Sequence, residues 1–235
     1  MRDGRAAVQD EGSQLVALAL AAVPSEATGV TAGRWLDLCA GPGGKAGLLA
    51  VLASAAGADL VANEVSEHRA DLVRATLAPA IAAAAERGST IEVRTGDGRD
   101  YGAEEPGTYD RVLVDAPCTG LGALRRRPEA RWRRQPGDLT ALGPLQRDLL
   151  RSALDATAPG GVVGYATCSP HLAETSFVVR DVVKRRDDVE ILDARPFFTQ
   201  ASNGALIDLG NGPFVQLWPH VHGTDGMFFA LLRRR

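Results

Sequence analysis

Short apolar segments alternate along this chain with longer segments whose apolar residues recur at helical spacing. The short segments are rich in Val, Leu and Ile, a composition typical of buried strands. They cover 34–38, 59–64, 91–94, 111–115, 162–168, 189–192 and 227–232. Strands that alternate with helices form right-handed crossovers, which place parallel strands in one sheet with helices on both faces. We therefore predict an α/β protein with a doubly wound parallel sheet.

Helical spacing of apolar residues predicts the remaining regular elements. These helices cover 8–23, the segment after Lys45 that carries Leu48, Leu49 and Leu52, and then 66–87, 144–157 and 174–186. The 235 residues suffice for one α/β domain with a substantial core, and no repeat divides them. We expect a single domain over residues 1–235 that begins with a helical lead-in over 1–30.

Composition and charge exclude several classes of protein. Apolar stretches are interrupted by Gly, Pro or charged residues before about 18 residues, so no membrane span is predicted. Residues 1–5 lack the apolar core of a secretory signal, and three cysteines without a CxxC pair indicate a reducing cytoplasm. His220 and His222 have no thiol or carboxylate cluster beside them, so we expect no metal site. With a net charge of −3, any nucleic-acid binding depends on a local basic patch.

A glycine-rich loop, Cys39–Lys45, connects the first strand to the following helix. Such a loop presents backbone N–H groups at a helix start, where a ligand can approach closely. It is not a phosphate-binding P-loop, because Gly41 to Lys45 is too short and Ala46 replaces the Ser or Thr of that motif. Alone, the loop could also be a purely structural turn.

Carboxylates stand at the ends of three further strands. Glu64 follows Gly44 by 20 residues, where a carboxylate can accept hydrogen bonds from both ribose hydroxyl groups. Asp97 ends the next strand and can hold an adenine amino group, and Asp115 ends the strand after it. With the glycine loop, these residues predict a site for a nucleoside cofactor. An NAD-dependent oxidoreductase shares this arrangement, but the chain lacks a convincing acid–base group for hydride transfer.

Two cysteines, Cys118 and Cys168, follow predicted strands, each beside Pro and Ser or Thr. If the strands are parallel neighbours, both thiols reach the carboxyl edge of the sheet, where α/β proteins bind ligands. One such cysteine alone would be interpreted as a buried structural thiol, but the pair favours nucleophilic chemistry on a bound substrate. The residues themselves do not say which thiol attacks. Cys39 is expected to be a small packed residue with backbone contact to the cofactor.

Three sequence motifs carry a resemblance to a known family. They are Asp37–Lys45, Asp115–Gly120 and Thr167–Pro170, supported by Val8–Gln14, Leu217–His220 and His222–Phe228. In this order they resemble the RsmB/Nop/Sun family of RNA cytosine-C5 methyltransferases, and the resemblance covers nearly the whole chain. Within that family, the chain is most similar to the bacterial enzymes that act on 16S rRNA.

The resemblance implies S-adenosyl-L-methionine as cofactor and a Rossmann-like class I methyltransferase fold with seven strands, the last one antiparallel. The residues expected at the cofactor are Cys39, Ala40, Gly41, Pro42, Gly43, Gly44, Lys45, Glu64, Arg69, Asp97, Gly98 and Asp115. The resemblance also implies that Cys168 is the nucleophile that adds to cytosine C6, and that Cys118 assists product release. A thiolate suits the first role because it is a strong nucleophile that can also depart.

Asp115 and Lys45 are further catalytic candidates. Asp115 stands three residues before Cys118 and can hydrogen-bond the N3/N4 edge of the base. Lys45, at a helix start, can lower the pKa of a thiol or orient the base. The target base must be splayed or flipped from its stack to reach such a site.

A basic segment follows the Cys118 loop. It contains Arg125, Arg126, Arg127, Arg131, Arg133 and Arg134, with Trp132 among them. Arginines bind phosphate groups and an aromatic ring can stack on an unpaired base. We therefore predict an RNA-binding rim formed by Arg125–Arg127, Arg131 and Trp132. The alternative is a solvated loop whose Trp132 packs on the domain.

The chain departs from the family pattern in two ways. Gly41 stands where the family usually has Ala, a small change that we expect to leave the turn intact. Bacterial members carry an N-terminal RNA-binding region, whereas this chain starts at the catalytic domain. We expect a monomer that methylates rRNA. A tRNA substrate, or a non-catalytic assembly factor that binds cofactor and RNA, are the alternatives.

Overall fold

An eight-stranded mixed sheet forms the centre of the computed structural model, in the order β3-β2-β1-β4-β5-β8-β6, with β7 paired to β8. The strands are β1 (Arg34–Asp37), β2 (Asp59–Glu64), β3 (Ile91–Thr95), β4 (Tyr109–Asp115), β5 (Thr157–Thr167), β6 (Val189–Leu192), β7 (Val215–Gln216) and β8 (Phe228–Arg234). The pairings among β1 to β5 are parallel, whereas β8 is antiparallel to β5 and β6. The predicted doubly wound sheet with an antiparallel last strand is confirmed, and β7 is an addition to it.

The structure describes residues 7–27 and 33–235. The predicted lead-in over 1–30 lies partly outside these residues. Residues 1–5, in which no secretory signal is expected, lie wholly outside them. Within the described part, the lead-in contains helix α1 (Glu11–Ala22).

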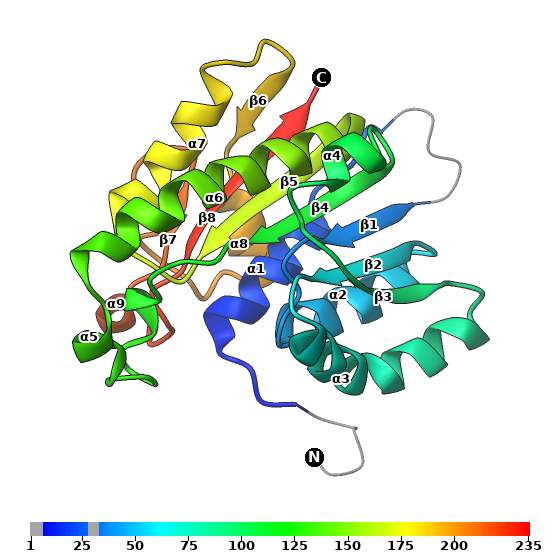
Figure 1. Cartoon of the computed structure of the whole chain (residues 1–235), viewed down its shortest axis with the longest axis horizontal. Helices are drawn as coiled ribbons and strands as arrows, with labels where there is room; N and C mark the ends of the chain where they lie inside the picture. Colours follow the sequence, from blue (N-terminus) through cyan, green and yellow to red (C-terminus); the bar gives the residue numbers. More distant parts are fainter. Residues whose placement is uncertain (1–6, 28–32) are drawn as a thin grey trace.

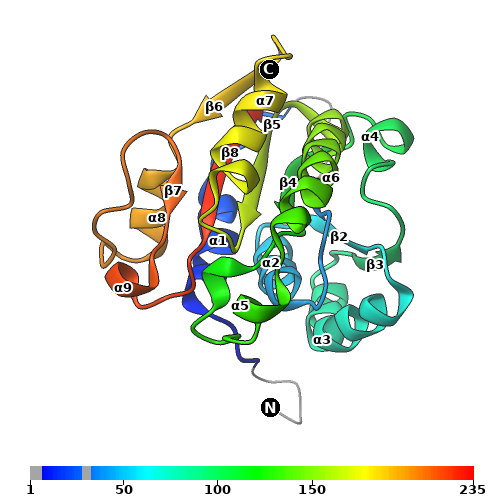
Figure 2. The same cartoon turned by 60° about the vertical axis from the view of Figure 1, so that its left-hand side comes forward.

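Helices cover both faces of the sheet. The others are α2 (Gly44–Ala55), α3 (Glu67–Glu86), α4 (Tyr101–Glu104), α5 (Ala130–Arg133), α6 (Pro136–Ala156), α7 (Ser176–Val183), α8 (Arg195–Ala201) and α9 (Pro219–His222), with 3-10 turns η1 (Leu121–Ala123) and η2 (Leu172–Glu174). One face carries α1, α2, α3 and α8, and the other carries α4, α6 and α7 (Figure 1, Figure 2). This three-layer arrangement leaves the ends of the strands as the open edge of the sheet.

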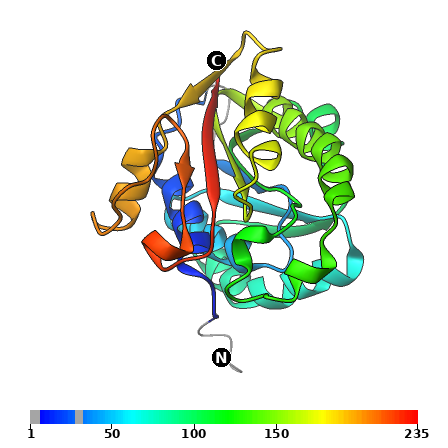
Figure 3. The same ribbon diagram turned by 90° about the vertical axis from the view of Figure 1, so that its left-hand side faces the viewer.

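Alternating side chains of the strands divide the core into two layers. In β2, Leu60 and Ala62 face the layer of α1, α2 and α3, whereas Val61 faces the opposite layer. In β8, which Figure 3 shows beside the short β7, Phe229 faces the first layer and Phe228 the second. Burial of each large apolar side chain contributes about 1.5–3 kcal/mol, so strands buried on both faces hold the open edge rigidly.

Helix α1 begins at Glu11, three residues later than predicted. The cause is Asp10, whose carboxylate accepts a hydrogen bond from the Gly12 N–H at 2.9 Å and caps the helix. The apolar spacing that begins at Val8 therefore extends beyond the true helix start.

Two predicted helices near the thiols have different bounds in the structure. Helix α6 begins at Pro136 instead of Pro144, because Gln135 and Asp138 form a capping box at the earlier position. Pro144 lies inside the helix, although proline lacks the N–H that an internal residue donates. The predicted helix over 174–186 is the shorter α7, which leaves Glu174 in the preceding turn η2.

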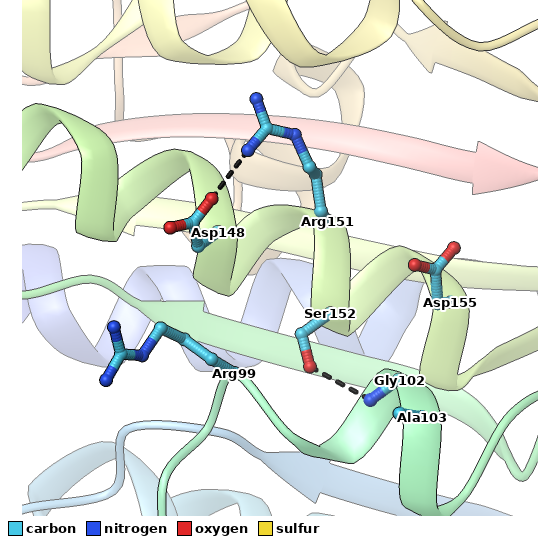
Figure 4. A pocket seen from close by; sticks show the side chains of 7 residues that line it. All are labelled: Arg99, Gly102, Ala103, Asp148, Arg151, Ser152 and Asp155. Carbon is cyan, nitrogen blue, oxygen red and sulfur yellow. Dashed lines mark hydrogen bonds and ion pairs between the residues drawn. The ribbon is translucent and has the colours of Figure 1, made fainter.

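Helix α4 packs on α6 through the Ser152 hydroxyl. This hydroxyl accepts a hydrogen bond from the Gly102 N–H at 2.9 Å and donates one to the Gly98 carbonyl at 2.7 Å. Figure 4 shows the Gly102 contact beside a hollow of about 420 Å³, where Arg151 pairs with Asp148 at 2.6 Å. The Gly98 contact anchors the loop after β3 to the helix layer.

Candidate active site

The carboxyl ends of β1 to β5 surround a cavity of about 410 Å³. Ten of the predicted site residues line it: Cys39, Gly41, Glu64, Arg69, Asp97, Gly98, Asp115, Cys118, Arg127 and Cys168. The predicted residues outside its lining are Ala40, Pro42, Gly43, Gly44, Lys45, Arg125, Arg126, Arg131 and Trp132. The fold thus brings the nucleoside-binding candidates and both thiols to one place.

Glu64, at the end of β2, holds the Cys39–Lys45 loop. One of its oxygens accepts a hydrogen bond from the Gly41 N–H and the other accepts one from the Ser66 N–H, both at 3.1 Å. Arg69 donates to the Gly41 carbonyl at 2.8 Å and lies 3.4 Å from Glu64. A Cβ atom at Gly41 would lie 2.1 Å from the Glu64 carboxylate. Gly41 therefore matters for the position of Glu64 as well as for the turn.

Asp97, the candidate for holding an adenine amino group, is engaged by Arg99. The Arg99 guanidinium contacts both carboxylate oxygens, the closer at 2.5 Å, and these hydrogen bonds lower the pKa of Asp97. Both residues line the cavity. A ligand amino group would therefore share the Asp97 carboxylate with Arg99.

Asn63 also lines the cavity, although it is not among the predicted site residues. Its side-chain amide donates to the Leu38 carbonyl and to the Gly96 carbonyl, each at 3.1 Å. Asn63 thus joins the loops that follow β1 and β3. The signal in the sequence is a polar residue that directly follows the apolar run Leu60–Ala62.

Lys45, the first-turn residue of α2, reaches across to the end of β4. Its Nζ lies 2.8 Å from Asp115 Oδ2 and 3.3 Å from the Ser13 hydroxyl. Burial works against the charged lysine, but the Asp115 charge and hydrogen bond outweigh it and raise the pKa of Lys45. The pair therefore joins the glycine loop to the strand that leads to Cys118.

Asp37, at the end of β1, is inaccessible to solvent, and neither of its carboxylate oxygens has a hydrogen-bond partner among residues 7–27 and 33–235. Burial, with the nearby Asp115 charge, raises the pKa of Asp37 to about 7, while Lys45 and the Cys39 backbone partly offset this effect. Asp37 belongs to the sequence motif but is not a predicted site residue. Its motif position could have drawn attention to it.

The sulfur atoms of Cys118 and Cys168 lie 3.5 Å apart. This proximity follows from the parallel pairing of β4 with β5, which sets Asp115 opposite Ala166. The hydrogen bond from Cys118 lowers the pKa of Cys168, and the Lys45 charge lowers it further, against burial and Asp115. The same contact, together with burial, raises the pKa of Cys118 well above its ordinary value. Cys168 is therefore the thiol that ionises more readily.

The predicted RNA-binding arginines divide into two groups. Arg125 and Arg126 pair with the buried carboxylates of Asp10 and Asp225, the Arg125–Asp10 distance being 2.8 Å. These pairs attach the basic segment to the start of α1 and to the approach of β8. Arg127 instead lines the cavity. The structure thus gives Arg125 and Arg126 a role in the fold that charge alone does not reveal.

The later part of the basic segment is more exposed. Trp132 has 72% of its surface exposed, so it does not pack on the domain, and the Arg131 guanidinium lies 5.8 Å from its ring centroid. Arg134, which is outside the predicted RNA-binding set, lines the cavity and donates to the Thr119 carbonyl at 2.7 Å. The cavity lining therefore carries Arg127 and Arg134, whereas the exposed Trp132 lies outside that lining.

Two further expectations concern the described residues. Over 7–27 and 33–235, no helix is both long enough and apolar enough to span a membrane. Within the same ranges, no group of three or more His, Cys, Asp or Glu side chains is arranged to hold a metal ion.

The strand order, the antiparallel β8 and the cavity at the strand ends are those of the Rossmann-like fold of S-adenosylmethionine-dependent methyltransferases. A family model described as 16S rRNA methyltransferase RsmB/F matches residues 17–233. The chain belongs to this family. The resemblance seen in the sequence and the cofactor that it implies are both confirmed.

Relatives and solved structures agree with this assignment. A Mycobacterium tuberculosis protein, named as a methyltransferase without a stated substrate, is 58% identical over 234 residues, which is 100% of this chain and 47% of that protein. Ribosomal RNA small subunit methyltransferase F of Serratia proteamaculans is 32% identical over 201 residues, 86% of this chain and 40% of the relative. The crystal structure of PH0851 has a TM-score of 0.82 and 28% identity, covering 99% of this chain and 48% of that one. The chain thus spans about half the length of the curated relatives it matches.

Proposed function

We propose that this chain transfers a methyl group from S-adenosylmethionine to C5 of a cytosine in ribosomal RNA, with 16S rRNA as the first candidate. The observation that carries the proposal is the thiol pair, 3.5 Å apart, in the same cavity that Glu64 and Asp97 line. A module that only bound cofactor and RNA would need no such pair. The name of the Serratia relative, a ribosomal RNA methyltransferase, supports the choice of rRNA.

The cavity fits S-adenosylmethionine in size and in its polar groups. Its volume of about 410 Å³ is within the usual range of small-molecule sites, about 300–1,000 Å³. Glu64 would hold the ribose hydroxyl groups, Asp97 the adenine amino group, and the Cys39–Lys45 loop the remaining polar atoms. When bound, the cofactor supplies an electrophilic methyl group.

Cys168 begins the proposed reaction. Its thiolate adds to cytosine C6, which forms a sulfur–carbon bond and makes C5 electron-rich enough to accept the methyl group. Once C5 carries the methyl group, transfer of the C5 proton to water restores the C5–C6 double bond, and the electron pair of the breaking sulfur–carbon bond leaves with the Cys168 thiolate. Lys45 supports the first step, because its charge lowers the pKa of Cys168 together with the Cys118 hydrogen bond.

Cys118 and Asp115 complete the proposed machinery. Cys118 holds a proton beside the Cys168 sulfur, where its S–H can donate a hydrogen bond to the Cys168 thiolate as it departs at product release. Asp115 lines the cavity while its Oδ2 is held by Lys45, so its carboxylate is oriented to bond the N3/N4 edge of a flipped base. Arg127, Arg131 and Trp132 would hold the surrounding RNA.

Methyl transfer from labelled S-adenosylmethionine to naked 16S rRNA, with tRNA as a parallel substrate, tests the proposal. We expect label in 16S rRNA, mapped by bisulfite sequencing to a cytosine. Label confined to tRNA would move the substrate to the tRNA alternative. Cofactor binding by calorimetry without transfer to either RNA would favour the assembly-factor alternative and overturn the proposed activity for this chain.

A further inference from the structure

Glu174 is a fully buried carboxylate between the two thiol loops, and no basic side chain of the described residues forms an ion pair with it. Its oxygens accept hydrogen bonds from the Thr119 N–H at 2.8 Å, from the Thr119 hydroxyl at 2.5 Å and from the Gln146 amide at 3.2 Å. A buried carboxylate is costly unless such donors satisfy it. The positions of these donors are therefore tied to the position of Glu174.

The donors to Glu174 hold both chain neighbours of Cys118. Thr119 follows Cys118 directly and gives Glu174 both its N–H and its hydroxyl. Gln146, from α6, also donates to the carbonyl of Pro117 at 2.8 Å, on the other side of Cys118. The Cys118 backbone is thus fixed from both directions.

Glu174 also belongs to the segment that follows Cys168. Its carbonyl accepts a hydrogen bond at 2.9 Å from the hydroxyl of Tyr165, a β5 residue close to Cys168. The Cys168 carbonyl in turn accepts a hydrogen bond from the Gly122 N–H of the other loop at 2.9 Å. Glu174 is therefore rooted beside one thiol while its carboxylate holds the loop of the other.

We propose that Glu174 is a positioning residue that sets the contact between the Cys118 and Cys168 thiols. Its catalytic meaning rests on the proposed methyl transfer, but the contact that it sets is measurable without RNA or cofactor. The Glu174 charge acts in the same sense, because it adds to the effects of Cys168 and of burial that raise the pKa of Cys118. Cys118 then remains a proton donor to Cys168.

A purely structural Glu174, which only anchors the start of α7, would affect stability and leave thiol chemistry unchanged. The test therefore measures the rate at which iodoacetamide alkylates Cys168 as a function of pH, by mass spectrometry of the whole chain. The variants are Glu174→Ala and the near-isosteric Thr119→Val. Asp181→Asn is the matched control, because it weakens a 2.8 Å contact with Arg147 that joins α6 to α7, the helix that follows η2.

Loss of the hydrogen bonds between Glu174 and Thr119 is expected to shift the alkylation profile of Cys168 to higher pH. The charged and titratable groups around Cys168, namely Cys118, Lys45, Asp115 and Asp225, all remain in each variant. The loss of the Cys118 hydrogen bond slows alkylation at pH 7 by about tenfold for each unit by which the pKa of Cys168 rises. We expect the full shift in Glu174→Ala, a smaller one in Thr119→Val and none in Asp181→Asn.

Wild-type alkylation profiles in both Glu174→Ala and Thr119→Val would overturn the inference. If Glu174→Ala does not fold, as judged by circular dichroism, the Thr119→Val profile decides alone. If the wild-type chain does not methylate RNA but the two variants show these pKa shifts, the proposed function is refuted and the positioning role of Glu174 stands. If the wild-type chain methylates RNA and neither variant shows a shift, the positioning role is refuted and the proposed function stands.

Discussion

The two halves of the cavity are held together in different ways. On the side of β1 to β3, the glycine loop is held by two neighbouring side chains. Glu64 accepts a hydrogen bond from the Gly41 N–H, and Arg69 donates one to the Gly41 carbonyl. On the side of β4 and β5, the thiol loops depend on Gln146 and Glu174, and the Thr119–Glu174 contact spans 55 residues of sequence. The cofactor half is therefore held by contacts between strand ends and the loops and helix start beside them, whereas the thiol half also depends on the packing of α6 against η2.

The largest effect is expected at the thiols themselves. Cys168→Ala should reduce methyl transfer by about 10⁴-fold or more and abolish any covalent RNA adduct, because the attacking atom is gone. Cys118→Ala should still permit attack but accumulate the adduct, because release is impaired. Denaturing gels with labelled RNA distinguish the two.

Cys39→Ala is the control for the thiol substitutions, since Cys39 lines the cavity without a partner thiol. It should accumulate no adduct and retain methyl transfer. The opposite gel pattern, with an adduct in Cys168→Ala and none in Cys118→Ala, would exchange the two roles.

The next largest effect is on the free energy of unfolding, and it concerns the buried carboxyl of Asp37 on the cofactor side of the cavity. Burial raises the folded pKa of this carboxyl from 3.8 to about 7. The protonated side chain is therefore favoured in the folded state, and its contribution to stability is complete below about pH 4 and lost as the pH rises to 7. At about 1.4 kcal/mol per pKa unit, the loss is on the order of 4 kcal/mol.

Asp37→Asn should remove this loss, because the amide is neutral at every pH. Urea unfolding is expected to show a higher free energy of unfolding at pH 8 than for the wild type, with little difference at pH 4. Equal stabilities of the two proteins at pH 8 would contradict the assigned burial effect.

A substitution at Glu64 should change cofactor binding without changing the reactivity of the thiols. Glu64→Gln should weaken S-adenosylmethionine binding by about 10- to 100-fold, since a hydrogen bond to a charged group contributes about 1.5–3 kcal/mol. Alkylation of Cys168 should be unchanged, because the hydrogen bonds and the ion pair that Glu64 forms within the described residues go to Gly41, Ser66 and Arg69. Calorimetry measures the first quantity, with the exposed Glu67→Gln as control. A simultaneous change in thiol reactivity would show that the halves are coupled.

The same difference, between contacts at strand ends and contacts that depend on helix packing, explains which site residues the sequence could predict. The glycine loop, Glu64 and the cysteines could be placed because each lies at the end of an apolar run or within a few residues of it. Glu174 could not, since its function depends on Thr119 and Gln146, which approach it only through the packing of α6 against η2. Apolar spacing assigned Glu174 to a helix, whereas the chain turns there and points its carboxylate inward.

Lys45 connects the halves, so its removal should have a moderate effect on both. Lys45→Met takes away a charge that lowers the pKa of Cys168, so that pKa rises and alkylation at neutral pH slows by about tenfold per unit. Lys45→Arg keeps the charge and should preserve most of the rate. An unchanged pH profile in Lys45→Met would leave the Cys118 hydrogen bond as the main cause of the low Cys168 pKa.

The smallest expected effect separates two arginines that look alike in the sequence. Arg127→Ala removes a cation from the cavity wall and should weaken RNA binding a few-fold, with a salt dependence shallower by about one phosphate contact. Arg125→Ala removes the arginine partner of the buried Asp10 carboxylate, so it should lower the melting temperature while leaving the salt dependence nearly unchanged. Filter binding across a salt series, with melting curves for both variants, measures the contrast. If Arg125→Ala also flattened the salt dependence, the arginine would serve RNA and the fold together, and the basic rim would extend beyond the cavity to the start of α1.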